Sequence, residues 1–422
     1  MLFSGASTIG GEAVYLTNPK WEAIFMKLTA EEKQILDQGF RKAFGYEPVR
    51  YFSAPGRTEI GGNHTDHQGG RVLAAAVDLD TRAAVASNGS STIRVLSEGY
   101  PLCRVDLSDL TPRPEECNTT AALIRGVAAG FAAQGCPVKG FDAYVMSTVL
   151  PGSGLSSSAA FEVLMGTILN CLFHNEVASP ESIAKIGQYA ENVFFGKPCG
   201  LMDQMASAVG GLVAMDFGSD MVRPLDCDLS QWDHALCIID THASHAELTG
   251  EYAAVPAEMK AVAAYFDCEI LSQVPAERFY EAIPGLRSQC GDRAVLRALH
   301  YYEENRRVQA QWAALEHGDF SSFLELVKAS GRSSFQYLQN VVVSGSTVHQ
   351  EMALALALCE KFLGGRGACR VHGGGFAGTI QAFVPKDLLE AFCMGMDGIL
   401  GPESCHVLSI RPYGGIELEV EE

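Results

Sequence analysis

The chain has 422 residues, of which 47% are hydrophobic, and its formal charge is −19. This length exceeds what one hydrophobic core usually supports, so we expect two domains. The acidic balance argues against a nucleic-acid partner, because binding a phosphate backbone requires clustered Lys and Arg side chains. An anionic ligand would have to be held by helix N-termini, backbone N–H groups, a few basic side chains or a metal ion.

Cysteine usage and the first residues indicate the compartment. The 13 cysteines are scattered, with no CxxC pair and no Cys/His cluster at zinc-ligand spacing, so the spacing predicts neither a disulfide framework nor a structural metal site. The N-terminus lacks a basic segment before an apolar run, and no apolar stretch is long enough to span a membrane. We therefore expect a cytoplasmic protein with reduced thiols and no membrane partner.

The first expected helix runs from Thr29 to about Phe44. Thr29 and Glu32 have the spacing of a capping box, and Gly45 supplies a stop. From Tyr51 the sequence becomes rich in glycine and polar residues, in the stretch SAPGRTEIGGNHTDHQGG. A small apolar run at 72–77 and further short strand-like segments through residue 96 follow it.

A glycine- and serine-rich loop joins an expected strand at 141–149 to an expected helix. The apolar residues from Phe161 to Phe173 recur with the spacing of one helix face. Small residues and hydroxyls at a helix start let the backbone approach a phosphate, while free N–H groups and the helix dipole face it. The loop is neither a Walker A loop nor a dinucleotide fingerprint, and taken alone it is equally compatible with a serine-capped turn. The candidate phosphate-binding residues are Gly152, Ser153, Gly154, Leu155, Ser156, Ser157 and Ser158.

The rest of the chain shows mainly helical patterns. A helix is expected from Ser179 to Phe195, with Ser179 as N-cap, Pro180 in the first turn and Gly196 as stop. Further helical patterns cover 252–266, 294–317 and 350–362, and a glycine-rich loop, HGGGFAG, precedes the strand-like TIQAFVP. We place a domain boundary in the polar segment before residue 228, which gives domains at 1–225 and 226–422.

Four segments resemble the motifs of one kinase family, in the family's order. PGSGLSSSAAFEV resembles the second motif of the superfamily of galactokinase, homoserine kinase, mevalonate kinase and phosphomevalonate kinase, abbreviated GHMP. APGRTEIGGNHTDHQGG resembles the galactokinase signature, GKPCGLMDQMASAVGG its catalytic-base segment, and RVHGGGFAGTIQAFVP its C-terminal glycine motif. The similarity runs from about residue 30 to the C-terminus, so the chain is identified as a member of the galactokinase family.

The resemblance implies an α+β, two-domain GHMP kinase fold. Its N-terminal domain would be α/β, its C-terminal domain a ferredoxin-like split βαβ unit, and its active site would lie in the cleft between them. It also implies an ATP-dependent sugar 1-kinase that uses Mg²⁺ and whose substrate is a small-molecule sugar. A monomeric state is compatible with this function. Asp203 matches the catalytic aspartate, which would accept the proton of the anomeric hydroxyl, and Arg57 the arginine beside it. Glu191 and Ser158 match the magnesium ligands.

The sugar-binding residues are also carried over from the family. Positions that contact substrate in galactokinases are matched by Asn63, His64, Asp66, Gly200 and Tyr252. His64 and His67 could suggest a metal site, but HTDH lacks a third well-spaced ligand, so we reject that interpretation.

The first motif departs from the family at positions that concern the substrate. Galactokinases usually read GEHTDYNGG where this chain reads GNHTDHQGG, so Asn63 replaces a glutamate thought to hold the C6 hydroxyl. Thr58 and Glu59 replace the usual Val-Asn, and Ala377 replaces a glycine, where a methyl group could forbid a positive φ. The substrate could therefore be galactose or a C6-altered sugar such as galacturonate or L-arabinose. A third reading is a regulatory sensor that binds sugar and nucleotide without catalysis.

Overall fold

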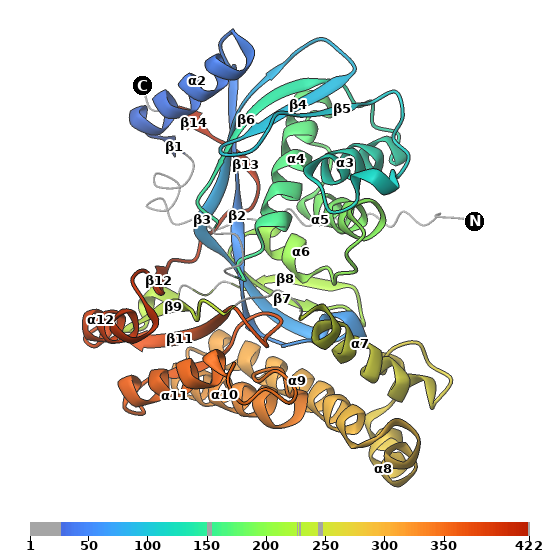
Figure 1. Cartoon of the computed structure of the whole chain (residues 1–422), viewed down its shortest axis with the longest axis vertical. Helices are drawn as coiled ribbons and strands as arrows, with labels where there is room; N and C mark the ends of the chain where they lie inside the picture. Colours follow the sequence, from blue (N-terminus) through green and yellow to red (C-terminus); the bar gives the residue numbers. More distant parts are fainter. Residues whose placement is uncertain (1–26, 150–153, 226, 228, 244–247, 421–422) are drawn as a thin grey trace.

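The computed structural model describes residues 27–149, 154–225, 227, 229–243 and 248–420. Helices and strands of these residues form two larger sheets with helices packed on their faces (Figure 1). The helices are α2 (Ala30–Phe44), α3 (Thr120–Ala133), α4 (Ser157–Phe173), α5 (Pro180–Tyr189), α6 (Met202–Val209), α7 (Thr249–Ala264), α8 (Ala276–Cys290), α9 (Asp292–Glu316), α10 (Phe320–Ser333), α11 (Glu351–Leu363) and α12 (Leu389–Leu400).

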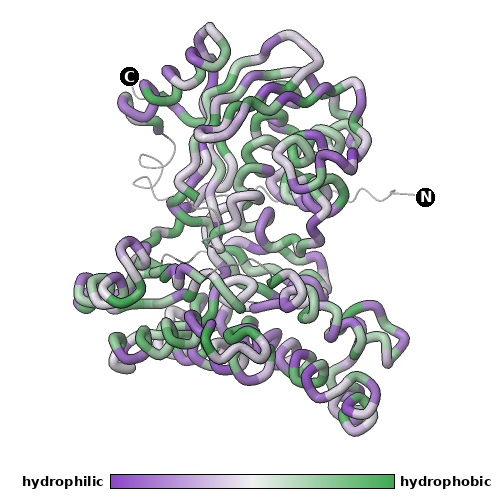
Figure 2. The backbone as a smooth tube through the Cα atoms, viewed as in Figure 1, coloured by the Kyte–Doolittle hydropathy of each residue, from purple (hydrophilic) through white to green (hydrophobic). Residues whose placement is uncertain are grey.

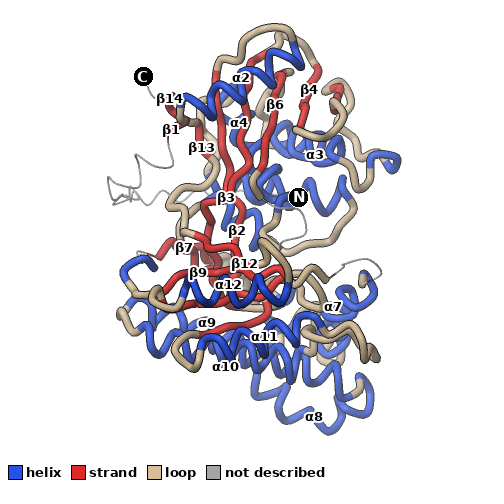
Figure 3. The backbone as a smooth tube through the Cα atoms, turned by 60° about the vertical axis from the view of Figure 1, so that its left-hand side comes forward, coloured by secondary structure: helices blue, strands red, loops and turns tan. Residues whose placement is uncertain are grey.

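The larger sheet is eight-stranded and includes two long antiparallel neighbours, β2 and β3. Figure 3 shows these two strands running from the upper to the lower part of the molecule. The strands of this sheet are β2 (Arg50–Gly61), β3 (Arg71–Ser87), β4 (Thr92–Ser97), β5 (Cys103–Asp106), β6 (Phe141–Ser147), β7 (Leu212–Asp216), β8 (Met221–Leu225) and β13 (Ile416–Glu417). Helices α3, α4, α5 and α6 cover one face through a common apolar core, and α2 packs on the other.

The smaller sheet is antiparallel, in the order β10, β11, β9, β12. Its strands are β9 (His234–Asp240), β10 (Ala368–Val371), β11 (Thr379–Pro385) and β12 (Cys405–Leu408), and a separate pair joins β1 (Lys27–Leu28) to β14 (Glu419–Val420).

Alternate residues of β9 point to opposite faces. Leu236 and Ile238 therefore pack toward α9 and α10, while Cys237 and Ile239 pack toward α11 and α12. Figure 2 shows hydrophobic segments in both the upper and the lower part of the molecule, in agreement with these separate cores.

Local signals in the sequence predicted several helices correctly. Thr29 and Glu32 form the expected capping box of α2, and Gly45 ends it in the left-handed conformation at φ 84°. Ser179 caps α5 as expected, but the helix changes to a π-helical turn at Ala190–Phe195 before Gly196 ends it.

The reading of the segment after Tyr51 as a glycine- and polar-rich stretch was incomplete, because its first part is strand β2. Almost every residue of β2 is buried, including Arg57 and Glu59, because polar groups from distant segments pair with them. The short segments expected from 72 to 96 are instead the 17-residue β3 followed by β4. Register irregularities between Pro55 and Arg57 and between Glu59 and Gly61 mark where β2 departs from a regular ladder.

Candidate active site

Asp203 and Arg57 form an ion pair with two hydrogen bonds. Asp203 lies in the first turn of α6, and Arg57 lies on β2. Nε and Nη2 of Arg57 donate to the two carboxylate oxygens of Asp203 at 2.7 and 2.8 Å, and Nη1 donates to the carbonyl of Gly154. Ser156 donates its hydroxyl to Oδ2 of Asp203 at 2.7 Å. The proposed base, the proposed cation and the phosphate loop therefore meet at one place.

The surroundings of Asp203 keep its carboxylate ionised. Burial by itself would raise its pKa, but the Arg57 charge and the hydrogen bonds from Arg57 and Ser156 outweigh burial, so the pKa of Asp203 is lowered. This carboxylate is therefore charged at neutral pH and can accept a hydrogen bond from a hydroxyl.

The described part of the phosphate loop is held between β2 and the smaller sheet. Gly152 and Ser153 lie outside the described residues. Gly154 has φ 73°, and a Cβ there would lie 2.8 Å from Oγ1 of Thr379 at the start of β11, so glycine is required. The buried Leu155 accepts the backbone N–H of Arg57 at 3.0 Å. Ser156 adopts φ 58°, and Ser157 begins α4.

Ser158 and Glu191, the expected magnesium ligands, lie side by side. Ser158 Oγ donates to Oε1 of Glu191 at 3.2 Å, and Glu191 is 2% exposed. Gln204 donates to Oε2 of Glu191 at 2.8 Å and to the fully buried Glu162 at 3.0 Å, whose Oε1 has no hydrogen-bond partner. Burial and the nearby Glu191 raise the pKa of Glu162 well above its usual value. These hard oxygen atoms, among them an unpartnered carboxyl oxygen of Glu162, fit a magnesium ion.

Lys197 is a cation at this site that the sequence reasoning missed. Its Nζ lies 3.2 Å from Oε1 of Glu191 although its side chain is 61% exposed. Burial of the ammonium would lower its pKa, but Glu191 and Asp203 outweigh this effect and raise it. Its position within the matched segment GKPCGLMDQ was the available signal, and Gln204 directly after Asp203 was another.

Three expected sugar-binding residues bind successive carbonyls of the C-terminal glycine loop, residues 372–378, which joins β10 to β11. Asn63 Nδ2 donates to Gly373 at 2.6 Å, His64 Nε2 to Gly374 at 2.9 Å, and the Tyr252 hydroxyl to Gly375 at 2.8 Å. His64 Nδ1 accepts from Nε2 of His67 at 3.3 Å, so the two imidazoles form part of a hydrogen-bonded chain. Burial lowers the pKa of both histidines, that of His67 to about 3. Both rings are therefore neutral.

Ala377 does not adopt a positive φ. In this loop the positive φ values belong to Gly373, Gly375, Phe376 and Gly378. The methyl group of Ala377 therefore meets no conformational penalty of the kind that the sequence suggested.

Asp66 and Gly200 are in direct contact. A Cβ on Gly200 would lie 1.7 Å from Oδ2 of Asp66, so any other residue at position 200 would force the Asp66 side chain to move. Burial, followed by the charge of Asp203, raises the pKa of Asp66 to about 7. Asp66 is therefore a group near Asp203 whose charge changes around neutral pH.

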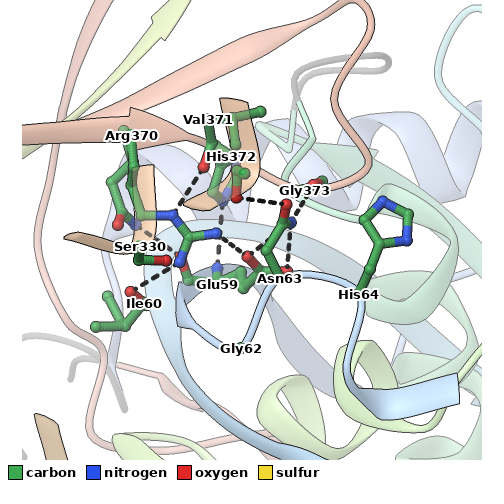
Figure 4. Close-up of polar contacts among 12 residues, drawn as sticks. Glu59, Ile60, Gly62, Asn63, His64, Ser330, Arg370, Val371, His372 and Gly373 are labelled. Atoms are coloured by element: carbon green, nitrogen blue, oxygen red, sulfur yellow. Dashed lines mark hydrogen bonds and ion pairs between the residues drawn. The ribbon is translucent and has the colours of Figure 1, made fainter. Parts of the chain in front are cut away.

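Asn63 belongs to a buried polar network with Glu59 and Arg370 (Figure 4). Asn63 and Arg370 are 0% exposed, and Glu59 is 3% exposed. Arg370 pairs with Glu59, and Asn63 Nδ2 donates to Oε1 of Glu59 at 3.1 Å. Asn63 Oδ1 accepts from Asn340 at 2.8 Å and from Ser334 at 3.2 Å. Both polar ends of Asn63 are thus bound to protein groups, and its contact with a sugar stays a prediction.

Similarity to known proteins indicates the family of this chain. The chain matches the profile of the GHMP kinases N terminal domain over residues 122–211 and that of the galactokinase galactose-binding signature over residues 38–87. Its fold is similar to that of Lactococcus lactis galactokinase complexed with galactose, with a TM-score of 0.80, 24% identity and coverage of 91% of this chain and 99% of that one. A mevalonate kinase structure has a TM-score of 0.61 at 12% identity, covering 88% of this chain and 100% of that one.

Fold and site together define a GHMP kinase with an α+β fold. The chain is 32% identical to the galactokinase of Actinobacillus pleuropneumoniae over 369 residues, which cover 85% of this chain and 91% of that protein. It is also 32% identical to the galactokinase of Glaesserella parasuis serovar 5 over 358 residues, 83% of this chain and 89% of that protein. The chain therefore belongs to the galactokinase family. Among the residues that the structure describes, no helix is both long and apolar enough to cross a membrane.

Proposed function

We propose that this protein transfers the γ-phosphoryl group of ATP to the anomeric hydroxyl of galactose or a close relative. The main support is the Asp203 carboxylate, which Arg57 and Ser156 hold ionised beside the phosphate loop. Phosphoryl transfer depends mainly on positioning and on charge stabilisation, and this pair supplies an acceptor for the hydroxyl proton and a fixed cation.

The lowered pKa of Asp203 constrains the timing of proton transfer. A weakly basic carboxylate orients the hydroxyl in the ground state and takes its proton as the new oxygen–phosphorus bond makes that proton acidic. Arg57 then offsets the negative charge of the transferred group while its second hydrogen bond keeps Asp203 in place. Arg57 is only 6% exposed, which limits the weakening of this interaction by water.

ATP phosphates would bind along the loop at the start of α4, where backbone N–H groups are free and the helix dipole favours an anion. Ser158 and Glu191 would hold Mg²⁺, which screens the phosphate charge when bound.

We also propose the domain division at 1–225 and 226–422, with the active site in a cleft between the two parts. The strand β13, which pairs with β2, then returns from the second part to the first.

A second candidate is the same reaction on a sugar with a different C6 group, such as galacturonate or L-arabinose. The usual family motif has an asparagine where this chain has Glu59 and a glutamate where it has Asn63. The acid and the amide are therefore exchanged between the two positions. The carboxylate of Glu59 is buried against Arg370 and bound by Asn63, so it cannot reach a C6 hydroxyl in the way a glutamate at position 63 would. The C6 carboxylate of a uronic acid would then not face a glutamate carboxylate at position 63, and the repulsion that excludes such a sugar would be absent.

The test is ADP release over a panel of galactose, galacturonate, N-acetylgalactosamine, L-arabinose and glucose. We expect turnover with galactose or one of its C6-altered relatives, and loss of that turnover in Asp203→Asn. Nuclear magnetic resonance of the product would place the phosphate on C1. Sugar-dependent nucleotide binding with no ADP release for any sugar would refute the enzymatic proposal and favour the regulatory sensor.

A further inference from the structure

Three cysteines that are far apart in the sequence meet in the smaller sheet. Cys237 lies on β9, Cys405 on β12 and Cys393 on α12. Their Sγ atoms all lie within 4.8 Å of one another, and those of Cys393 and Cys405 are 3.3 Å apart. All three are free thiols, with Cys237 buried and the other two half-buried. No part of the proposed phosphoryl transfer uses them.

The packing of the sheet explains why these thiols converge. Strands β12 and β9 are antiparallel, and Cys405 stands opposite Ile239, two residues from Cys237 on the same face. Helix α12 covers this face and brings Cys393 to the same point. The carboxylate of Asp397, one turn after Cys393, accepts the backbone N–H of Cys405 at 2.9 Å and so ties α12 to the start of β12.

We propose that Cys237, Cys393 and Cys405 form a binding site for a divalent thiophilic metal ion, with Zn²⁺ as the expected occupant. A Zn²⁺–thiolate bond is about 2.3 Å, so tetrahedral coordination requires sulfur–sulfur separations of about 3.8 Å. The Sγ atoms of Cys393 and Cys405 are about 0.5 Å closer than this value, at 3.3 Å, and all three sulfur atoms lie within 4.8 Å of one another, so small side-chain movements would give tetrahedral spacing. The fourth position would hold water, since the described residues offer only these three ligands.

The charge of the site favours a divalent ion. Binding converts three thiols to thiolates, releases their protons to solvent and leaves one net negative charge around Zn²⁺. A monovalent ion would leave two negative charges beside the Asp397 carboxylate.

Another group with three possible ligands is less suitable. Cys171, Glu176 and Glu417 also lie close together in the described part of the chain, but both carboxylate oxygens of Glu417 are bound by Arg50. A metal ion there would have to displace a guanidinium, whereas in the described part of the chain no cation hydrogen-bonds to the thiols of the cysteine cluster.

The experiment uses the reduced, chelator-treated full chain and Co²⁺ as a spectroscopic probe, followed by Zn²⁺. We expect one equivalent of Co²⁺ to give sulfur-to-metal charge-transfer absorption, which Zn²⁺ abolishes and excess Mg²⁺ does not. Cys393→Ser and Cys405→Ser should each weaken binding by about a hundredfold or more, since even groups outside the coordination sphere contribute roughly 10- to 100-fold. Cys290→Ser, which removes another half-buried thiol, should bind as the unmodified chain does.

The unmodified protein alone can overturn the proposal, so the test does not depend on the variants folding. Absence of thiolate charge transfer at one equivalent of Co²⁺ would exclude the site. Equal binding by a Cys393→Ser/Cys405→Ser double variant would also exclude it. Formation of a Cys393–Cys405 disulfide in air, without metal binding by the reduced chain, would show that the cluster has a redox property instead.

Discussion

Introducing the family's usual glutamate at position 63 should destabilise this protein, because the chain already buries a carboxylate beside that position. Asn63 is 0% exposed, and its Nδ2 lies 3.1 Å from Oε1 of Glu59 and 2.6 Å from the carbonyl of Gly373. In Asn63→Glu two carboxylates would face each other, which at about 4 Å and an effective dielectric constant of about 20 costs about 4 kcal/mol. We expect the free energy of unfolding to fall by about 3–5 kcal/mol, the usual cost of an uncompensated buried charge.

The converse substitution, Glu59→Asn, should lower the free energy of unfolding by a similar amount. Glu59→Asn leaves the fully buried Arg370 without its carboxylate, although Arg370 still donates to the carbonyls of Ile60 at 3.2 Å and Val371 at 2.9 Å. The double variant Glu59→Asn/Asn63→Glu restores one carboxylate and one amide in this network. Its destabilisation should therefore be smaller than the sum of the two single effects by about 2 kcal/mol or more.

Urea unfolding of the two single variants, the double variant and Asn63→Gln gives the complete cycle. Asn63→Gln adds the same length as glutamate without its charge, so it separates packing from electrostatics. If Asn63→Gln is as unstable as Asn63→Glu, or if the single effects add, the argument from buried charge is wrong. The double variant is also the proper protein in which to measure whether a glutamate at position 63 raises kcat/KM for galactose relative to galacturonate.

Four further predictions concern the catalytic groups. Asp203→Asn should keep nucleotide binding and lower kcat by roughly 10²- to 10⁴-fold, and retention of more than a few per cent of kcat would exclude an essential base. Ser158→Ala and Glu191→Gln should each raise the Mg²⁺ concentration that half-saturates activity, while an unchanged titration in both would place the metal elsewhere. Lys197→Met should lower that concentration by roughly twofold to fivefold, because an exposed ammonium no longer competes for Glu191; a higher requirement would assign Lys197 to the phosphates instead. The raised pKa of Asp66, about 7 against 3.8, means that the native state holds its proton more tightly, so stability should fall as pH rises from about 4 to 7, and Asp66→Asn should flatten this fall in a pH series of melting temperatures.

Elements that depend on neighbouring residues were predictable from the sequence. The capping box of α2, the recurring apolar residues of α4 and the proline-led start of α5 use signals that lie within a few residues. The matched motifs also brought Asp203, Arg57 and the Ser158–Glu191 pair together as expected, because the family's motif order carries the tertiary arrangement with it.

Elements that depend on distant partners were not predictable. Strand β2 has a glycine-rich, polar sequence, and its buried Arg57 and Glu59 are tolerated only because Asp203 and Arg370 pair with them. The return of β13 to β2 has no local signal, since its pairing spans most of the chain. The spacing of cysteines in the sequence also does not reveal the three-cysteine cluster, because a strand, a helix and another strand each contribute one thiol.

The glycine loop lies close to both the expected sugar-binding residues and the phosphate loop. Its carbonyls at Gly373 to Gly375 each accept a hydrogen bond from an expected sugar-binding residue, and His372 at its start contacts the space beside Gly154 of the phosphate loop. A sugar hydroxyl that takes one of these donors leaves a loop carbonyl unpaired, which costs about 1–3 kcal/mol if that carbonyl stays buried. The loop would then shift or find new partners, and its His372 ring lies close to the phosphate loop, since a Cβ added at Gly154 would be 3.1 Å from Nδ1 of His372. Under the proposed function, a sugar that takes these donors would therefore disturb the loop whose His372 side chain lies beside Gly154.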